Sequence, residues 1–158
     1  MTTATQEIMI ARWHPSFTED VARLCKAFSE ESLNEYGLGV EQDRLDQMIE
    51  VCKDIAFFLL ATDPQTGYPK PVGVIAGFMV ANMTNGKPAL QEVIWYMDKE
   101  HRTHGKLLLE AFEKLGKERG ATSIIMALMC NSMQDRLDKF YQRLGYKPFE
   151  VQYMKEIT

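Results

Sequence analysis

The sequence is poor in cysteine, and its three cysteines show none of the spacings that bind metal ions. No Cys-x-x-Cys pair occurs, and the odd number is typical of a reducing compartment rather than of a disulfide-bonded secreted domain. No apolar run approaches the roughly 20 residues of a membrane helix, and no signal peptide is recognised at the start. These absences favour a cytoplasmic protein with no membrane segment and no metal site.

Positive charge is not in excess either. Lysine and arginine number 18 against 22 acidic residues, for a net charge of -4. General nucleic-acid binding needs a dominant basic face, so the charge balance argues against it. The chain has 158 residues without repeats, low-complexity segments or a linker. Its length suits one core, and we expect a single domain over residues 1–158.

Hydrophobic periodicity predicts a series of strands and helices along the chain. Strands are expected at 7–13, 56–62, 71–82, 92–97, 122–129 and 149–157, and helices at 16–34, 41–53, 105–119 and 132–144. A helix connects the strand at 92–97 to the strand at 122–129, so these two strands must be parallel and joined by a right-handed crossover. This order predicts a mixed α/β (α+β) fold, in which a central mixed sheet is covered by helices on both faces. The first two helices and their glycine-containing link are the natural place for substrate contacts.

Local signals mark where the helices begin and end. Ser16 and Glu19 have the spacing of a capping box, which predicts that the first helix starts at Ser16. Gly120 and Gly145 each follow an apolar helical stripe, as expected for a glycine just past a helix end.

Other signals concern the strands. Gly73 and Gly77 inside one strand suggest a bulge or a close backbone approach. Asn85-Gly86 is a hairpin signal. The run 122–129 is almost wholly apolar, as expected of a strand covered on both faces.

The stretch 91–120 combines a strand, a basic polar loop and a helix. Arg102, His104 and Lys106 surround Gly105, where the helix is expected to begin. A helix N-terminus has free backbone N–H groups and a partial positive charge, so this arrangement can hold a phosphate or pyrophosphate. The apolar face expected for the helix consists of Leu107, Leu108, Ala111, Phe112 and Leu115.

Two segments resemble motifs of the GNAT acetyltransferase superfamily. The first runs from Ile94 to Arg102 (IWYM-x4-R) and continues as Thr103-His104-Gly105, which is similar to the family's acetyl-CoA motif R/Q-x-x-G-x-G/A. The second, KFYQRLGYK at 139–147, is similar to the family's last helix end. The element order matches over nearly the whole chain. The amino-acid sequence of both segments is similar to that of GNAT proteins encoded by tailed bacteriophages.

The acetyl-CoA motif can be aligned in two registers, and both stay open. If Arg102 starts the motif, Gly105 is its first glycine and Leu107 occupies the next glycine or alanine position. If the helix and Gly120 set the register, Gly105 is the last glycine and Thr103 stands where the first would be.

The resemblance implies an enzyme that transfers acetyl from acetyl-CoA to a primary amine by direct attack. A lysine-type amine has a pKa of about 10.4, so a base must take its proton at neutral pH. The family's base is often a carboxylate on the strand before the cofactor loop, which is Glu92 here. Its usual acid is a tyrosine four positions before the last glycine, which is Tyr141. The structural alternatives are that Glu92 is a solvated carboxylate at the end of a strand and that Tyr141 is an aromatic residue of the core.

The resemblance also implies an acetyl-CoA site. Main-chain groups of the strand would pair with pantetheine as with an added strand, and the loop N–H groups would receive the pyrophosphate. The implied cofactor-binding residues are Trp95, Met97, Arg102, Thr103, His104, Gly105, Lys106, Leu107 and Asn131.

Several alternatives remain at this point. A catalytically weak GNAT-fold binding module, such as a phage factor acting on a host protein, is the second hypothesis. The acceptor is left open among small amines, polyamines, protein lysines and protein N-termini, and so is a homodimer. If the gene is from a phage, the location is the host cytoplasm. Cys130 is expected to be a small buried hydrophobe.

Overall fold

A computed structural model describes residues 7–131 and 133–157. The chain forms two compact units, of which the first runs to Ala127 and the second begins at Leu128. One domain over residues 1–158 stays a prediction.

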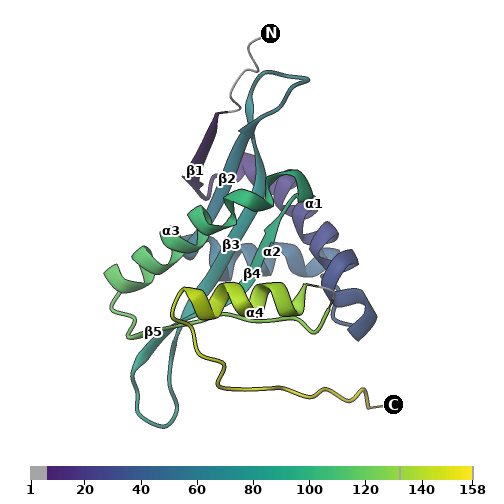
Figure 1. Cartoon of the computed structure of the whole chain (residues 1–158). Helices are drawn as coiled ribbons and strands as arrows, with labels where there is room; N and C mark the ends of the chain where they lie inside the picture. Colours follow the sequence, from purple (N-terminus) through teal and green to yellow (C-terminus); the bar gives the residue numbers. More distant parts are fainter. Residues whose placement is uncertain (1–6, 132, 158) are drawn as a thin grey trace. The chain divides into compact units, whose positions relative to one another are not determined.

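The first unit is built on one five-stranded sheet with the order β1-β2-β3-β4-β5 (Figure 1). Neighbouring strands are antiparallel from β1 to β4, whereas β5 runs parallel to β4. The predicted mixed sheet is therefore confirmed. Its strands are β1 (Ile8–Arg12), β2 (Ala56–Thr62), β3 (Pro69–Ala81), β4 (Pro88–Met97) and β5 (Ser123–Ile125).

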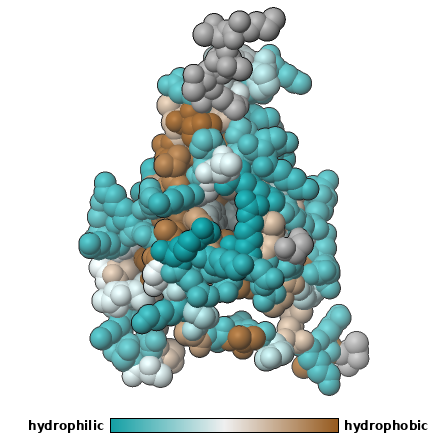
Figure 2. Space-filling view, in the orientation of Figure 1, coloured by the Kyte–Doolittle hydropathy of each residue, from teal (hydrophilic) through white to brown (hydrophobic). Residues whose placement is uncertain are grey.

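Helices cover both faces of this sheet (Figure 1). Helices α1 (Thr18–Phe28) and α2 (Leu45–Cys52) pack on one face, and α3 (Gly105–Glu118) packs on the other. Because strand side chains alternate, Phe58 and Val74 belong to the α1–α2 core. The fourth helix, α4 (Gln134–Arg143), lies in the second unit. Most of the visible surface is hydrophilic (Figure 2).

The predicted capping box at Ser16 is wrong. A 3-10 turn (Pro15–Phe17) precedes α1, and the ring Nδ1 of His14 accepts the Ser16 N–H at 3.1 Å. The α-helix itself begins at Thr18 without a side-chain cap, because His14 has already capped the turn that leads into it.

Helical structure continues beyond α1. One turn of π-helix (Ser29–Leu33) and one of 3-10 helix (Asn34–Tyr36) follow, and Gly37 ends them at a φ of 68°. The predicted helix end near Asn34 therefore lies close to the observed one. A π-turn changes which side chains share a face, and such turns are frequent at functional sites.

The two predicted helix-ending glycines are confirmed. Gly120 and Gly145 have φ values of 86° and 89°. The N–H of Ala121 reaches the carbonyl of Gly116 at 2.9 Å, and that of Tyr146 reaches the carbonyl of Tyr141 at 3.0 Å. Both ends are thus Schellman motifs, which favour glycine because its backbone enters the left-handed region freely.

The predicted bulge at Gly77 is also confirmed. The β3–β4 register shifts between Ala76 and Gly77, since Ala76 lies opposite Ile94 and Gly77 opposite Glu92. Val93 is the extra residue on β4. The Asn85-Gly86 signal lies in the loop of the β3–β4 hairpin, where Gly86 has a φ of 70°.

The strand predicted at 122–129 is shorter than expected and only partly buried. It pairs with β4 over Ser123–Ile125 alone, and none of its residues is fully buried. Apolar sequence shows that a segment avoids water, but the length of a strand depends on its neighbour, and β4 diverges from β5 after Gln91.

The strand predicted at 149–157 is not found among the described residues. Phe149, Val151 and Tyr153 alternate as expected but are 73%, 74% and 95% exposed. Alternating apolar residues indicate that a segment is suited to a sheet, but a strand forms only where a partner strand is present. For the helix predicted at 132–144, the start at Ser132 lies outside the described residues, and α4 begins at Gln134.

The buried stripe of α3 differs from the predicted one, because Leu109 belongs to it whereas Leu107 and Ala111 do not. Leu109 is 1% exposed, whereas Leu107 is 43% exposed. The buried residues of α3 are Gly105, Leu108, Leu109, Phe112, Leu115 and Gly116.

Candidate functional site

A gap opens in the sheet where β4 and β5 separate, and Glu92 lies at its start. Strand β5 pairs with β4 only as far as Gln91. Beyond that point the Glu92 Oε2 accepts the backbone N–H of Ala127 at 3.1 Å. A side-chain carboxylate therefore bridges the strands where the backbone ladder has ended.

The predicted base, Glu92, is buried, with 9% of its surface exposed. Burial raises the pKa of its carboxyl to about 7, and the Ala127 N–H partly opposes the shift. The structural alternative of a solvated strand-end carboxylate does not describe this environment. A carboxylate that titrates near neutral pH can accept a proton from an amine during attack.

The predicted cofactor loop is a 3-10 helix (Lys99–His104) that joins α3 directly. Gly105 donates its N–H to the Arg102 carbonyl, so this group is already used within the loop. A Cβ at Gly105 would lie 3.4 Å from the Trp95 ring, an ordinary contact. The helix N-terminus thus packs against a β4 residue assigned to the same site.

The side chain of Arg102 is held by protein groups. Its Nη2 lies 2.6 and 2.7 Å from the two carboxylate oxygens of Glu31, and its Nε donates to the Met97 carbonyl at 3.3 Å. The guanidinium also lies over the Tyr96 ring, 5.8 Å from its centroid. Burial, followed by the Glu31 carboxylate, raises the pKa of the Tyr96 hydroxyl. Arg102 therefore connects the cofactor loop to the π-turn that carries Glu31.

A second ion pair holds the end of β4. Arg23 of α1 places Nη1 at 2.9 and 3.1 Å from the Asp98 carboxylate oxygens, and its Nη2 donates to the Pro71 carbonyl at 2.7 Å. The segment that leads from β4 into the cofactor loop is thus fixed to α1. Sequence reasoning missed both Glu31 and Arg23, which lie 71 and 75 residues from their partners.

The other loop residues present polar or exposed side chains. Thr103, Lys106 and Leu107 are exposed, and His104 is half-buried. The Nζ of Lys106 lies 3.6 Å from Glu110 on the helix surface, a pair that salt can screen.

The remaining two predicted site residues, Tyr141 and Asn131, lie in the second unit. Tyr141 is buried on α4, with its ring centroid 5.4 Å from that of Tyr146. The Oδ1 of Asn131 accepts the N–H of Met133 at 2.9 Å, in the turn before α4. Asn131 thus has a structural role at this helix start.

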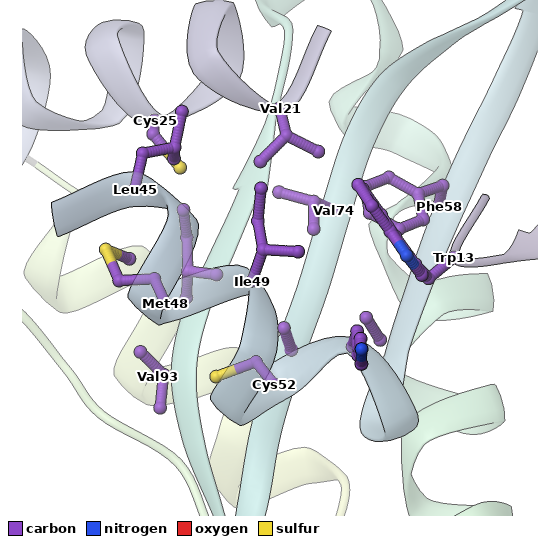
Figure 3. A pocket seen from close by; sticks show the side chains of 14 residues that line it. Trp13, Val21, Cys25, Leu45, Met48, Ile49, Cys52, Phe58, Val74 and Val93 are labelled. Atoms are coloured by element: carbon purple, nitrogen blue, oxygen red, sulfur yellow. The ribbon is translucent and has the colours of Figure 1, made fainter. Parts of the chain in front are cut away.

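Two cavities lie on the α1–α2 face, against the bulge of β4. The smaller one, of about 40 Å³, lies between α1, α2 and the sheet (Figure 3). The larger one, of about 300 Å³, is bounded by the π-turn, the 38–41 loop, α2 and β4. Its lining consists of Phe28, Leu33, Leu38, Gly39, Val40, Glu41, Arg44, Met48, Val93 and Ile94. It is lined in part by the helical pair and the link between its helices, where the sequence analysis predicts substrate contacts.

The cysteines supply no reactive thiol within the α1–α2 core. Burial, with a smaller contribution from nearby Cys52, raises the pKa of Cys25 to about 11, and burial also raises the pKa of Cys52. Both thiols are therefore protonated at neutral pH and poorly nucleophilic. Cys130 is exposed, so the prediction that it is buried is wrong.

No three His, Cys, Asp or Glu side chains among residues 7–131 and 133–157 gather in a way that could hold a metal ion. Within the same residues, no helix has the length and apolar content that crossing a bilayer requires.

Comparison with known proteins places this geometry in context. The sequence profile of the acetyltransferase (GNAT) family matches residues 21–146. No curated protein matches the sequence.

Solved structures share the fold at low sequence identity. An aminoglycoside acetyltransferase from an uncultured soil metagenomic sample has a TM-score of 0.67 at 18% identity, covering 96% of this chain and 99% of that one. The ribosomal-protein-alanine N-acetyltransferase of Brucella melitensis biovar Abortus 2308 has a TM-score of 0.63 at 18% identity, covering 96% and 100%. The glucosamine-6-phosphate N-acetyltransferase of Arabidopsis thaliana has a TM-score of 0.61 at 17% identity, covering 96% and 99%.

Proposed function

Because the chain belongs to the acetyltransferase (GNAT) family, we propose that this GNAT-type acyltransferase moves an acetyl group from acetyl-CoA to a primary amine by direct attack in a ternary complex. In this proposal Glu92 is the base and Tyr141 is the acid. The observation that carries it is the buried Glu92 carboxyl, whose pKa is about 7, at the point where β4 and β5 separate.

Acetyl-CoA supplies an acetyl thioester, and the protein supplies proton transfers. Glu92 takes a proton from the amine as its nitrogen attacks the thioester carbonyl. Tyr141 gives a proton to the departing thiolate when the C–S bond breaks. The products are an N-acetylated amine and free CoA. Both residues are restored when Glu92 releases its proton to water and Tyr141 takes a proton from water.

The open edge of β4 and the start of α3 are suited to hold acetyl-CoA. Beyond Gln91 no described strand pairs with the β5-side edge of β4. In this proposal pantetheine lies along that edge near Trp95 and Met97, as the family resemblance implies. In this proposal the backbone of Arg102, Thr103, His104, Lys106 and Leu107 faces the pyrophosphate. The Arg102 side chain instead stabilises the loop through Glu31. We keep Gly105 and Asn131 in the site, as the family motif implies.

The family match does not favour the alternative of a catalytically weak binding module. Cytoplasmic location, a bacteriophage source and a homodimer remain proposals. The acceptors named for the three solved relatives differ from one another, and at such low identity none is carried over to this chain.

The test begins with acetyl-CoA binding by calorimetry. We expect micromolar binding by the wild type and its loss in Gly105→Trp, which fills the start of α3. Val51→Trp places the same side chain on an exposed position of α2 and is the matched control. Circular dichroism must show that both variants are folded. Absence of binding by the folded wild type at millimolar acetyl-CoA would reject the proposal.

The proton-transfer roles are tested next, with an amine that the wild type acetylates. Glu92→Gln keeps an oxygen for the Ala127 N–H and removes the base, so kcat/KM should fall by roughly 10²–10⁴-fold. In the wild type, kcat/KM should rise with pH through a pKa near 7, because the base acts only when it is ionised. Tyr141→Phe should lower kcat by roughly ten-fold or more. Full activity in Glu92→Gln would remove this residue from the mechanism.

A further inference from the structure

The larger cavity, of about 300 Å³, has the size of a site for a small molecule. Ligand pockets range from roughly 300 to 1,000 Å³, so it lies at the lower end of that range. Val93 and Ile94 form its wall on β4, directly after Glu92 in the chain. The bulge leaves Val93 without a partner on β3, and its side chain is 36% exposed.

The wall of this cavity is mostly apolar. Four apolar side chains come from the π-turn region and the loop that follows it, one from α2 and two from β4. A wall of this kind binds a ligand by removing its apolar surface from water. It offers few groups that could replace the hydration of a polar ligand, so a ligand rich in hydroxyl or ammonium groups would lose hydrogen bonds on entry.

The smaller cavity extends this apolar environment. The two cavities share Met48, Val93 and Ile94, so they lie against each other. Figure 3 shows Met48 and Val93 at the border of the smaller one. Met48 is unbranched and flexible, and its movement can adjust the wall to the length of a ligand.

The charged residues of the larger cavity do not select a strongly charged ligand. Glu41 and Arg44 have opposite signs, and both are exposed. The Nη1 of Arg44 donates to the Oε1 of Gln47 in the first turn of α2 at 3.1 Å. Two exposed charges of opposite sign largely cancel at a distance, so selection falls to the apolar wall.

We propose that the acceptor is a small primary amine carrying an apolar body, of the arylalkyl or alkyl type, and that this body occupies the larger cavity while the amine lies toward the β4 bulge. This rests on the proposed acetyl transfer. It assigns the cavity as the acceptor site and excludes highly polar acceptors, such as polyamines, aminosugars and sugar phosphates, as preferred substrates.

The test compares acceptors of different polarity. Acetyl-CoA binding is first measured by calorimetry without any amine. Initial rates are then measured with phenethylamine, hexylamine, ethanolamine, spermidine, kanamycin and glucosamine 6-phosphate. The kcat/KM for phenethylamine should exceed that for ethanolamine at least ten-fold, because a single methylene in an apolar pocket already contributes roughly ten-fold or more.

Two substitutions place polarity in the cavity without large changes in volume. Leu38→Gln alters a residue that is 51% exposed, and Met48→Gln is close to isosteric. Each should lower kcat/KM for phenethylamine roughly ten-fold, weaken phenethylamine binding by a similar factor, and leave the acetyl-CoA Kd within two-fold. Val51→Gln lies three residues from Met48 on α2, outside the cavity lining, and should match the wild type.

The outcomes separate the two proposals. The inference is supported if the protein binds acetyl-CoA and prefers apolar amines, and if both cavity variants lower this preference. Acetyl-CoA binding with spermidine, kanamycin or glucosamine 6-phosphate preferred overturns it and leaves acetyl transfer intact. Equal phenethylamine kinetics in Leu38→Gln, Met48→Gln and Val51→Gln would also overturn it. Failure to bind acetyl-CoA removes the proposed function itself, and with it the role of an acceptor site.

Discussion

The two faces of the sheet are packed very differently. On the α3 face, the packing at Gly77 and Gly116 leaves no room even for a methyl group. A Cβ at Gly77 would overlap the carbonyl oxygen of Gln91 and lie 2.9 Å from Phe112, and one at Gly116 would lie 2.7 Å from Leu90. On the α1–α2 face, the helices leave cavities of about 40 and 300 Å³.

This difference separates two tasks. Close packing at Gly77 and Gly116 fixes α3 against β3 and β4, which suits the acetyl-CoA site that we propose at the start of this helix. Loose packing between β4, the π-turn and α2 leaves space that a ligand can fill. Glu92 lies between these regions, in the gap of the sheet.

The strongest test of the tight face is Gly77→Ala. The new Cβ collides with backbone of β4, which cannot move without disturbing the bulge, so we expect a loss of about 3 kcal/mol in the free energy of unfolding. Urea denaturation followed by circular dichroism measures it. A loss below about 1 kcal/mol would show that the tight face can relax.

Glu92→Gln tests the residue between the faces. It should change the free energy of unfolding about as much as Gly77→Ala does, but by an amount that depends on pH. The folded pKa of about 7 lies above the unfolded value of 4.5, so the folded state holds a proton that the unfolded state releases between these values. The wild type therefore loses stability as the pH rises from about 4.5 to 7. Above that range the buried carboxylate costs up to about 3 kcal/mol.

The measurement is urea denaturation at pH 5 and pH 8. Glu92→Gln should be more stable than the wild type at pH 8 and close to it at pH 5. Glu118→Gln, at the exposed end of α3, controls for loss of a surface charge. A difference between wild type and Glu92→Gln that is the same at both pH values would contradict the assignment.

Arg102→Gln tests the connection between the cofactor loop and the π-turn. The two side chains of this ion pair are only 30% and 28% exposed, so removing one partner should cost about 1–2 kcal/mol of stability. The acetyl-CoA Kd should change less than ten-fold, because Glu31 already engages the guanidinium. A double-mutant cycle with Glu31→Gln gives the coupling energy, and Lys106→Gln, from an exposed pair, is the control. A larger loss of acetyl-CoA affinity would make the side chain a direct ligand.

The smallest effect is expected on the loose face. Val74 lies on the same strand as Gly77 and lines the smaller cavity. Val74→Ile adds one methylene there, and the free energy of unfolding should change by less than about 1 kcal/mol. If this change costs as much as Gly77→Ala, the contrast between the two faces fails.

The sequence predicts what depends on local chemistry. The strand 56–62, the bulge at Gly77 and the glycine helix ends at Gly120 and Gly145 were all predicted, because each follows from side-chain periodicity or from a backbone conformation that glycine adopts. The family resemblance also indicated the mixed sheet with helices on both faces.

What depends on distant partners was not predicted. The end of β5 is set by where β4 turns away, and the extended 149–157 segment has no partner strand among the described residues. The environment of Glu92 depends on Ala127, 35 residues away, and that of Arg102 depends on Glu31. One local prediction also failed, because His14, two residues before Ser16, supplies the cap instead.

The open edge of β4 has a consequence for solubility. A strand with unpaired N–H and C=O groups is a template on which another extended chain can assemble, and edge strands commonly escape this by carrying an inward-pointing charge. Glu92 places a carboxyl group at the start of the open edge, and the pKa of this group is about 7. We therefore expect Glu92→Gln, although more stable at pH 8, to precipitate at lower protein concentration than the wild type.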